Sequence, residues 1–334
     1  MPPPTRSSSE AREFIKVLSG AAAWPIAVRA QPAGKVYRIG VLETIPQALN
    51  APNLDALRRG LRARGYVEGN NLLIEYRSAD GRADRFPGVA TELIRLGVDL
   101  LVTRGTPAAQ AAKNATATIP IVMAAIGEPL GVGVVATLAH PGGNVTGLSA
   151  FVTELAAKRI ELAKETFPSI QRIAFLTNMG NPIAPPQWEA VKIAAAALGL
   201  SAELLDTRKE QDIEQGFDTA VDHKVNVISV NIDGLIQLKA DMIVELAARH
   251  KILTIYPSRE FVEAGGLISY GVNYPDLYYR SATLIDKIFK GAKPGDLPVE
   301  QPVKFELIVN LKTANALGLT MPPAILATAD EVIE

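Results

Sequence analysis

The fold class follows from residues 98–129, VDLLVTRGTPAAQAAKNATATIPIVMAAIGEP. The apolar run at 98–102 predicts a buried strand, and the alanine-rich stretch at 108–114 predicts a helix after it. A second apolar run at 121–125 starts the same pattern again. Strands that alternate with helices in this way predict an α/β fold with a mainly parallel sheet.

The turn between the first of these strands and its helix has the residues expected of a ligand-binding turn. Gly105 permits a tight turn, Thr106 suits a helix N-cap, and Pro107 suits the first helical position. The free N–H groups of a helix start attract anions, and open α/β sheets bind ligands at the carboxyl ends of their strands. We therefore expect residues 103–106 and 125–128 to line one edge, with Thr106 and the free N–H groups of Ala108 and Ala109 holding a carboxylate. The alternative is that these are ordinary turns of an α/β protein.

Composition excludes several classes of protein. The chain has 334 residues, 48% of them hydrophobic, which is enough for about two globular domains. Its formal net charge of −1 argues against a nucleic-acid or anionic-membrane partner. The chain has no cysteine, its three histidines lack metal-ligand spacing, and no nucleotide-binding, metalloprotease or serine-hydrolase motif occurs. We expect no catalytic set, no metal and no cofactor, and hence no enzyme.

Residues 1–34 have the layout of an export signal, with a basic region, a short apolar region and a small-x-small site at 28–30. The mature chain should then begin near Gln31 and be periplasmic. The sequence around Phe14 resembles a twin-arginine signal, but Ala11 stands where the first arginine belongs, so the Sec and twin-arginine routes both remain open. A disordered cytoplasmic extension is the alternative.

The order of predicted strands and helices repeats along the chain. One series runs from Val36 to about residue 151, with a short helix expected at 132–138. A similar series runs from there to Tyr270, with a single helix expected at 235–250. The repeat predicts two similar lobes, each a mainly parallel sheet flanked by helices.

The elements after Gly271 exceed what the second lobe needs, so we expect the chain to cross back between the lobes. One lobe should comprise residues 35–150 with 272–300, and the other residues 151–271 with 301–334. The crossings near Ala150, Tyr270 and Pro302 would form a multi-segment hinge about which the lobes move as rigid bodies.

Polar and aromatic residues at the predicted strand ends are the candidate ligand contacts, because a small-molecule site combines apolar walls with a few placed donors and acceptors. Each residue alone could equally be a turn former or a helix cap. We expect Tyr256 or Tyr270 to offer a ring face to the ligand. The predicted ligand-binding set is Glu43, Thr44, Gly105, Thr106, Pro107, Ala125, Glu128, Asn178, Asn181, Asp233, Tyr256, Tyr270 and Asn273.

Several strings give the chain a family resemblance, among them GYVEGNN at 65–71, PGGNVTG at 141–147 and YGVN at 270–273. From about residue 36 to its end the chain resembles the substrate-binding proteins of ABC importers, and more narrowly the group that includes binders of aromatic amino acids. The resemblance implies a type I periplasmic-binding fold, a ligand between the lobes and no catalysis.

The sequence therefore predicts an exported solute-binding protein. It should bind a small molecule, such as an amino acid or another small carboxylate, and deliver it to a membrane permease, acting as a monomer. A cytoplasmic α/β enzyme and the core of a ligand-sensing regulator are the alternatives.

Overall fold

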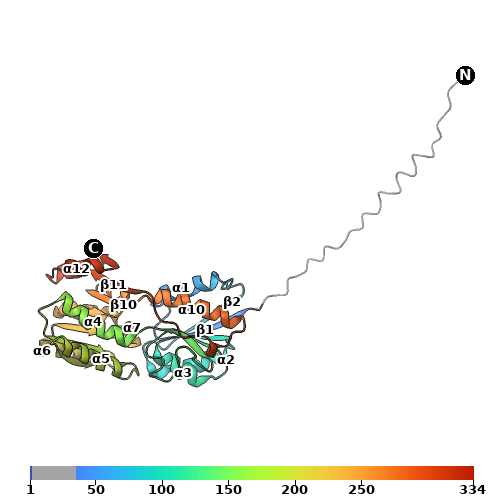
Figure 1. The fold of residues 1–334 in the computed structure, drawn as a ribbon, viewed down its shortest axis with the longest axis horizontal. Coiled ribbons are helices and arrows are strands. Elements are labelled where there is room, and N and C mark those ends of the chain that lie inside the picture. Colours follow the sequence, from blue (N-terminus) through green and yellow to red (C-terminus); the bar gives the residue numbers. More distant parts are fainter. Residues whose placement is uncertain (2–34) are drawn as a thin grey trace. The chain divides into compact units, whose positions relative to one another are not determined.

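The computed structural model describes residue 1 and residues 35–334 (Figure 1), and residues 36–334 form one compact unit. The predicted export signal and its cleavage site lie outside the described residues. The unit contains two sheets, and the predicted α/β class with two mainly parallel, helix-flanked sheets is confirmed.

The first sheet is fully parallel and has the order β2-β1-β3-β4-β5. Its strands are β1 (Tyr37–Glu43), β2 (Leu72–Ser78), β3 (Leu100–Arg104), β4 (Ile121–Ile126) and β5 (Val145–Ser149). Successive residues of β3 and β4 face opposite sides of the sheet, so both faces bury apolar side chains. One face is covered by α1 (Ala51–Arg62) and α10 (Tyr274–Phe289), and the other by α2 (Phe86–Arg95) and α3 (Thr106–Ala115) (Figure 1).

The second sheet repeats this strand order and extends it. Its order is β7-β6-β8-β9-β10-β11-β12, parallel except for the pair of β10 and β11. The strands are β6 (Arg172–Thr177), β7 (Ser201–Asp206), β8 (Val227–Val230), β9 (Leu253–Tyr256), β10 (Ile268–Val272), β11 (Phe305–Asn310) and β12 (Glu331–Ile333).

Helices cover both faces of the second sheet as well. One face carries α4 (Val152–Thr166), α5 (Ala184–Ala197), α11 (Leu311–Ala316) and α12 (Pro323–Thr328). The other carries α6 (Glu210–Asp222), α7 (Gly234–Leu238), α8 (Ala240–His250) and α9 (Arg259–Glu263).

The chain passes between the sheets at residues 149–152, 272–274 and 300–305. After β10 it returns to the first sheet, where α10 packs against α1 and Glu300 pairs with Leu148 beside β5. It then enters the second sheet again as β11. Two short 3-10 helices, Ala83–Arg85 and Pro294–Asp296, complete the elements of the described residues.

Some sequence expectations are wrong. Residues 132–138 form turns and bends instead of a helix, because Gly133 adopts a left-handed φ of 68°. Lys113 donates to the carbonyls of Gly133 and Val134 at 2.7 and 2.9 Å. The valines at 134 and 135 are buried, so their spacing reflects a turn docked on the core. The single helix expected at 235–250 is divided at Lys239 into α7 and α8.

Each sheet has a point where the strand order reverses, and these points position the site. From β1 the chain continues to α1 on one face, whereas from β3 it continues to α3 on the other. The corresponding strands of the second sheet are β6, which leads to α5, and β8, which leads to α7. The helices diverge at such a reversal and leave a crevice at the carboxyl ends of the strands, where α/β folds bind ligands.

Candidate ligand-binding site

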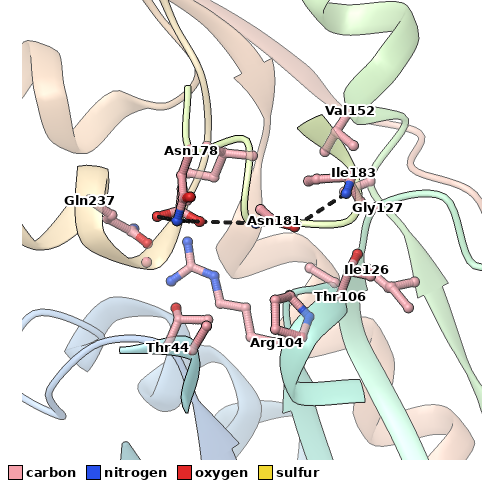
Figure 2. Close-up of a pocket in the computed structure, with 18 of the residues that line it drawn as sticks. Thr44, Arg104, Thr106, Ile126, Gly127, Val152, Asn178, Asn181, Ile183 and Gln237 are labelled. Carbon is pink, nitrogen blue, oxygen red and sulfur yellow. Dashed lines mark hydrogen bonds between the residues drawn. The ribbon is translucent and has the colours of Figure 1, made fainter. Parts of the chain in front are cut away.

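A cavity lies between the reversal points of the two sheets (Figure 2). The first sheet and its connections supply Thr44, Gly81, Ala83, Phe86, Arg104, Gly105, Thr106, Pro107, Ala125, Ile126, Gly127, Ala150 and Tyr274. The second sheet and its connections supply Val152, Asn178, Asn181, Ile183, Ile232, Asp233, Gly234 and Gln237. Apolar walls with a few polar groups at fixed positions are typical of a small-molecule site.

Thr106 lies at the start of α3 with its hydroxyl unused. Gly105, not Thr106, is the N-cap, with a φ of 81° that suits only glycine, and Thr106 is the first residue of the helix. The predicted cap is therefore wrong. Thr106 is 1% exposed, and its Oγ1 has no hydrogen-bond partner among the described residues.

The first turn of α3 offers fewer free donors than predicted. The N–H of Ala109 donates to the carbonyl of Gly105 at 3.2 Å, so the expectation that it is free is wrong. Pro107 has no N–H, and its ring occupies an early helical position without removing a hydrogen bond. The hydroxyl of Thr106 and the backbone N–H groups of Thr106 and Ala108 remain as donors at this helix start among the described residues.

Arg104 ends β3 and lines the cavity; it falls within the edge expected at 103–106 but is not in the predicted ligand-binding set. The pairing of β3 with β4 shifts register between Thr103 and Arg104, and an irregularity of this kind re-aims a side chain. Arg104 is 3% exposed, and its guanidinium lies over the ring of Tyr274 at 4.5 Å from the centroid. Its Nη1 donates to Asn50 at 3.3 Å, and its Nη2 has no partner among the described residues.

Glu43 lies behind the cavity and Thr44 lines it. One carboxylate oxygen of Glu43 accepts from the hydroxyl of Tyr278, and the other accepts from the Thr44 N–H at 3.1 Å. Burial raises the pKa of Glu43, although the positive charge of Arg104 acts in the opposite direction. Glu43 thus belongs to the support of the cavity, next to the buried guanidinium.

Asp233 is the acidic group of the cavity on the side of the second sheet. Its carboxylate accepts from the side chain of Asn181 at 3.0 Å, from the N–H of Leu235 at 2.9 Å and from Asn178 at 3.4 Å. Burial raises the pKa of Asp233, and these donors oppose that rise. Figure 2 places Gln237 and Asn178 on the same side of the cavity.

Part of the predicted set meets in this cavity. The predicted residues that line it are Thr44, Gly105, Thr106, Pro107, Ala125, Asn178, Asn181 and Asp233. The remaining predicted residues do not line it, and these are Glu43, Glu128, Tyr256, Tyr270 and Asn273.

The two tyrosines and Asn273 have other contacts. Tyr256 is 0% exposed and stacks on Phe261 at 5.1 Å in the core of the second sheet. Tyr270 stacks on Phe305 at 6.5 Å in a separate surface groove. Asn273 caps α10 by accepting from the N–H of Asp276.

The predicted ligand-binding set lacks Arg104, Gln237 and Tyr274, although Arg104 falls within the edge expected at 103–106. A charged residue directly after an apolar run was the available signal for Arg104, and Tyr274 directly follows the YGVN string at 270–273. Gln237 lies inside a predicted helix and gave no signal.

The lining combines a buried cation, a buried carboxylate and neutral donors. Neither lining threonine hydroxyl bonds to Asp233 among the described residues. The described part of the chain holds no cluster of histidine, aspartate or glutamate suited to a metal ion. None of its helices has the length and apolar character needed to cross a bilayer. The arrangement suits the binding of a small molecule that carries both charges.

Comparison with known proteins gives the chain its relatives. The family model of the ABC transporter substrate-binding proteins matches residues 39–333. A tyrosine-binding protein of Clostridioides difficile is 29% identical over 279 residues, which are 82% of this chain and 80% of that protein.

Solved structures agree with this relationship. An ABC domain from Streptococcus pneumonia in complex with L-Trp is 31% identical, with a TM-score of 0.82 over 89% of this chain and 99% of that one. A ligand-free, open substrate-binding protein with adhesive properties from Clostridium difficile is 28% identical, with a TM-score of 0.66 over 90% and 99% of the two chains. The fold extends to a periplasmic binding protein from Alkaliphilus metalliredigens that is 12% identical, with a TM-score of 0.56 over 81% of this chain and 96% of that one.

Proposed function

The chain belongs to the family of ABC transporter substrate-binding proteins, and from this premise we propose that it captures an amino acid and delivers it to a membrane permease. Membership implies a small-molecule ligand, a permease partner and a role in binding instead of catalysis. The amino acid as ligand, the export of the chain and its monomeric state are our proposals.

The observation that carries the proposal is the pair of opposite charges in one cavity. Arg104 comes from the first sheet and Asp233 from the second, and no ion pair joins them. An amino acid carries an ammonium and a carboxylate. Its ammonium can donate to the acceptor on the side of the second sheet, and its carboxylate can accept from donors on the side of the first sheet. Desolvated polar groups without partners are costly, and a ligand that pairs with them gains that free energy.

The relatives support the same ligand class. One is named a tyrosine-binding protein and another was solved with L-Trp. Tyrosine and tryptophan share the ammonium and the carboxylate that the cavity would bind.

A thermal-shift and calorimetry panel of the proteinogenic amino acids and small carboxylates tests the proposal. A ligand that binds only the native state raises the melting temperature, by an amount that grows with its concentration. We expect at least one amino acid to shift the melting temperature and to titrate with a 1:1 stoichiometry. Failure of every amino acid to bind would contradict the proposed function.

We further propose that residues 35–150 with 272–300 and residues 151–271 with 301–334 are lobes that close on the ligand. The three crossing segments and the position of the cavity support this division. The similarity in TM-score is greater to the L-Trp complex, 0.82, than to the open, ligand-free relative, 0.66, at nearly equal identity. Small-angle scattering should show a smaller radius of gyration with ligand than without it.

Export is tested on protein recovered from the native host. We expect the abundant form to begin near Gln31 and to be found in the periplasm. An intact Met1 on that form would contradict export by a cleaved signal. Size-exclusion chromatography with light scattering tests the monomer.

A further inference from the structure

We propose that Arg104 determines which amino acid this chain takes, and that its ligand has an acidic side chain. This inference rests on the proposed function and adds the class of substrate. Three positions in the cavity would each bind one charged group of the ligand. Asp233 would hold the ammonium, Thr106 and the start of α3 the α-carboxylate, and Arg104 the side-chain carboxylate.

The guanidinium of Arg104 lacks the partner that its burial demands. Nη1 makes one long hydrogen bond to Asn50, the ring of Tyr274 lies against the guanidinium, and Nη2 is unpartnered among the described residues. The negative charges of Glu43 and Glu260 also act on the guanidinium, but no ion pair joins either of them to it. Glu43 lies nearby, but its oxygens already accept from Tyr278 and Thr44, and it forms no ion pair with Arg104. A buried guanidinium is normally paired with a carboxylate or phosphate, because leaving it unpaired is strongly destabilising.

Separate donors exist for the α-carboxylate. The hydroxyl of Thr106 is buried and unpartnered, and the positive end of the ten-residue helix α3 lies behind it. In Figure 2 the guanidinium of Arg104 extends away from Thr106, toward the side of the cavity where Asn178 and Gln237 lie. The two donor groups are therefore available to two different anionic groups of one ligand.

Phe86 and Tyr274 are the aromatic residues that line the cavity, and the two tyrosines expected to offer a ring face do not line it. Tyr256 is enclosed in the core and Tyr270 lies at another groove. Of the ring of Tyr274, one face is covered by the guanidinium of Arg104. An uncharged ring placed at this end of the cavity would bury Arg104 further without supplying a carboxylate.

Calorimetry on the full chain tests the inference with L-glutamate, L-aspartate, their neutral amides L-glutamine and L-asparagine, and L-tyrosine and L-tryptophan. We expect each acid to bind at least about tenfold more tightly than its amide. One hydrogen bond between charged groups contributes enough free energy of binding to account for this difference in affinity. Arg104→Gln should bring the ratio of acid to amide close to one. Arg104→Lys should keep part of the preference, because it retains the charge but loses the planar fork.

Arg159→Gln is the matched control. Arg159 is also a buried arginine, 2% exposed with an unpartnered Nε, but it lies in α4 and does not line the site. It lines an adjoining cavity that shares Ala150, Val152, Ile232 and Tyr274 with the site. We expect it to affect stability and leave the ratio of acid to amide unchanged. Because the readout is a ratio of affinities, a loss of stability in either variant does not alter it.

The outcomes separate the two proposals. Tight binding of L-tyrosine or L-tryptophan with weak binding of the acids, or an unchanged ratio in Arg104→Gln, would overturn the role of Arg104 and leave the amino-acid carrier standing. Absence of binding by both acids to the wild type would overturn the acidic ligand, and only failure of every amino acid in the full panel would overturn the carrier as well.

Discussion

The side-chain amide of Asn181 donates a hydrogen bond of 3.0 Å to the carboxylate of Asp233 inside the cavity. Asn181 follows β6 and Asp233 follows β8, so the bond joins the two turns at the reversal point of the second sheet. Leu235 donates its backbone N–H to the same carboxylate at 2.9 Å. Every protein partner of Asp233 is a donor, which fixes the carboxylate as an acceptor for the ligand.

Asp233→Asn should weaken the binding of amino acids by at least about tenfold, because the amide cannot form a charge-assisted bond with an ammonium. The asparagine oxygen can still accept from Leu235, so α7 keeps its cap. Calorimetry with the amino acid that binds the wild type best measures the loss. Its analogue without the amino group should bind both proteins with similar affinity, and an equal loss for the two ligands would contradict an ammonium contact.

The stability of the same variant, relative to that of the wild type, should increase as the pH rises toward neutrality. Burial raises the pKa of Asp233 above its ordinary value of 3.8, so the folded state holds the proton more tightly than the unfolded state does. Stability then falls as the pH rises through this raised pKa, and the asparagine variant avoids that loss. In urea unfolding without ligand, the advantage of the variant should shrink as the pH is lowered toward 3.8. An advantage that grows at acid pH would show that the pKa is depressed.

The sequence predicts the strands well because their apolar runs are buried on both faces, as in β4, where every residue from Ile121 to Ile126 is buried. It also predicts which residues follow a strand, as for Thr44 and Asp233. It does not predict which side of a strand end meets the cavity. Tyr256 ends β9 yet packs into the core, because the direction of a side chain depends on the register and twist of the strand.

Arg104 is the opposite case, a residue that the sequence pattern would leave in solvent and that instead lines the cavity. An arginine at the end of an apolar run is ordinarily a solvated residue. It becomes a cavity residue here through the register shift between β3 and β4 and through the ring of Tyr274, which comes from a helix 170 positions later in the chain. Neither contact has a local signature in sequence.

Thr106→Ala and Thr106→Ser test whether the hydroxyl of Thr106 binds the α-carboxylate. Since Oγ1 makes no hydrogen bond in the folded chain, the loss of the hydroxyl should cost less than the ~1 kcal/mol typical of a lost helix cap. Affinity for the best amino acid should fall at least about tenfold in the alanine variant and be largely kept in the serine variant. Thermal melts without ligand and calorimetry with it measure the two effects. Equal affinity of the wild type and the alanine variant would remove this hydroxyl from the site.

Gly127→Ala tests whether the cavity closes around the ligand. A Cβ at Gly127 would lie 2.8 Å from Cγ2 of Ile183 and 2.9 Å from Cγ2 of Val152, two side chains from the opposite side of the cavity. The φ of Gly127 lies outside the left-handed region, so alanine can adopt this backbone. The closest conflicts are with the two facing side chains, and Oγ1 of Thr106 lies 3.2 Å from the added Cβ. We expect weaker binding of the amino acid and a larger radius of gyration at saturating ligand.

Gly88→Ala is the matched control for this variant. Gly88 lies in α2, is exposed, and has nothing within 4 Å of the added Cβ. Alanine should stabilise the chain there by about 0.5–1 kcal/mol through the lower backbone entropy of the unfolded state and leave affinity unchanged. If lobe closure brings Gly127 against Ile183, only Gly127→Ala alters the scattering difference between free and bound protein.

If the two sides of the cavity are fixed, the overlap is present without ligand as well, and Gly127→Ala should lower the melting temperature of the free protein. The melt and the scattering profile together therefore decide between a closing cleft and a rigid cavity.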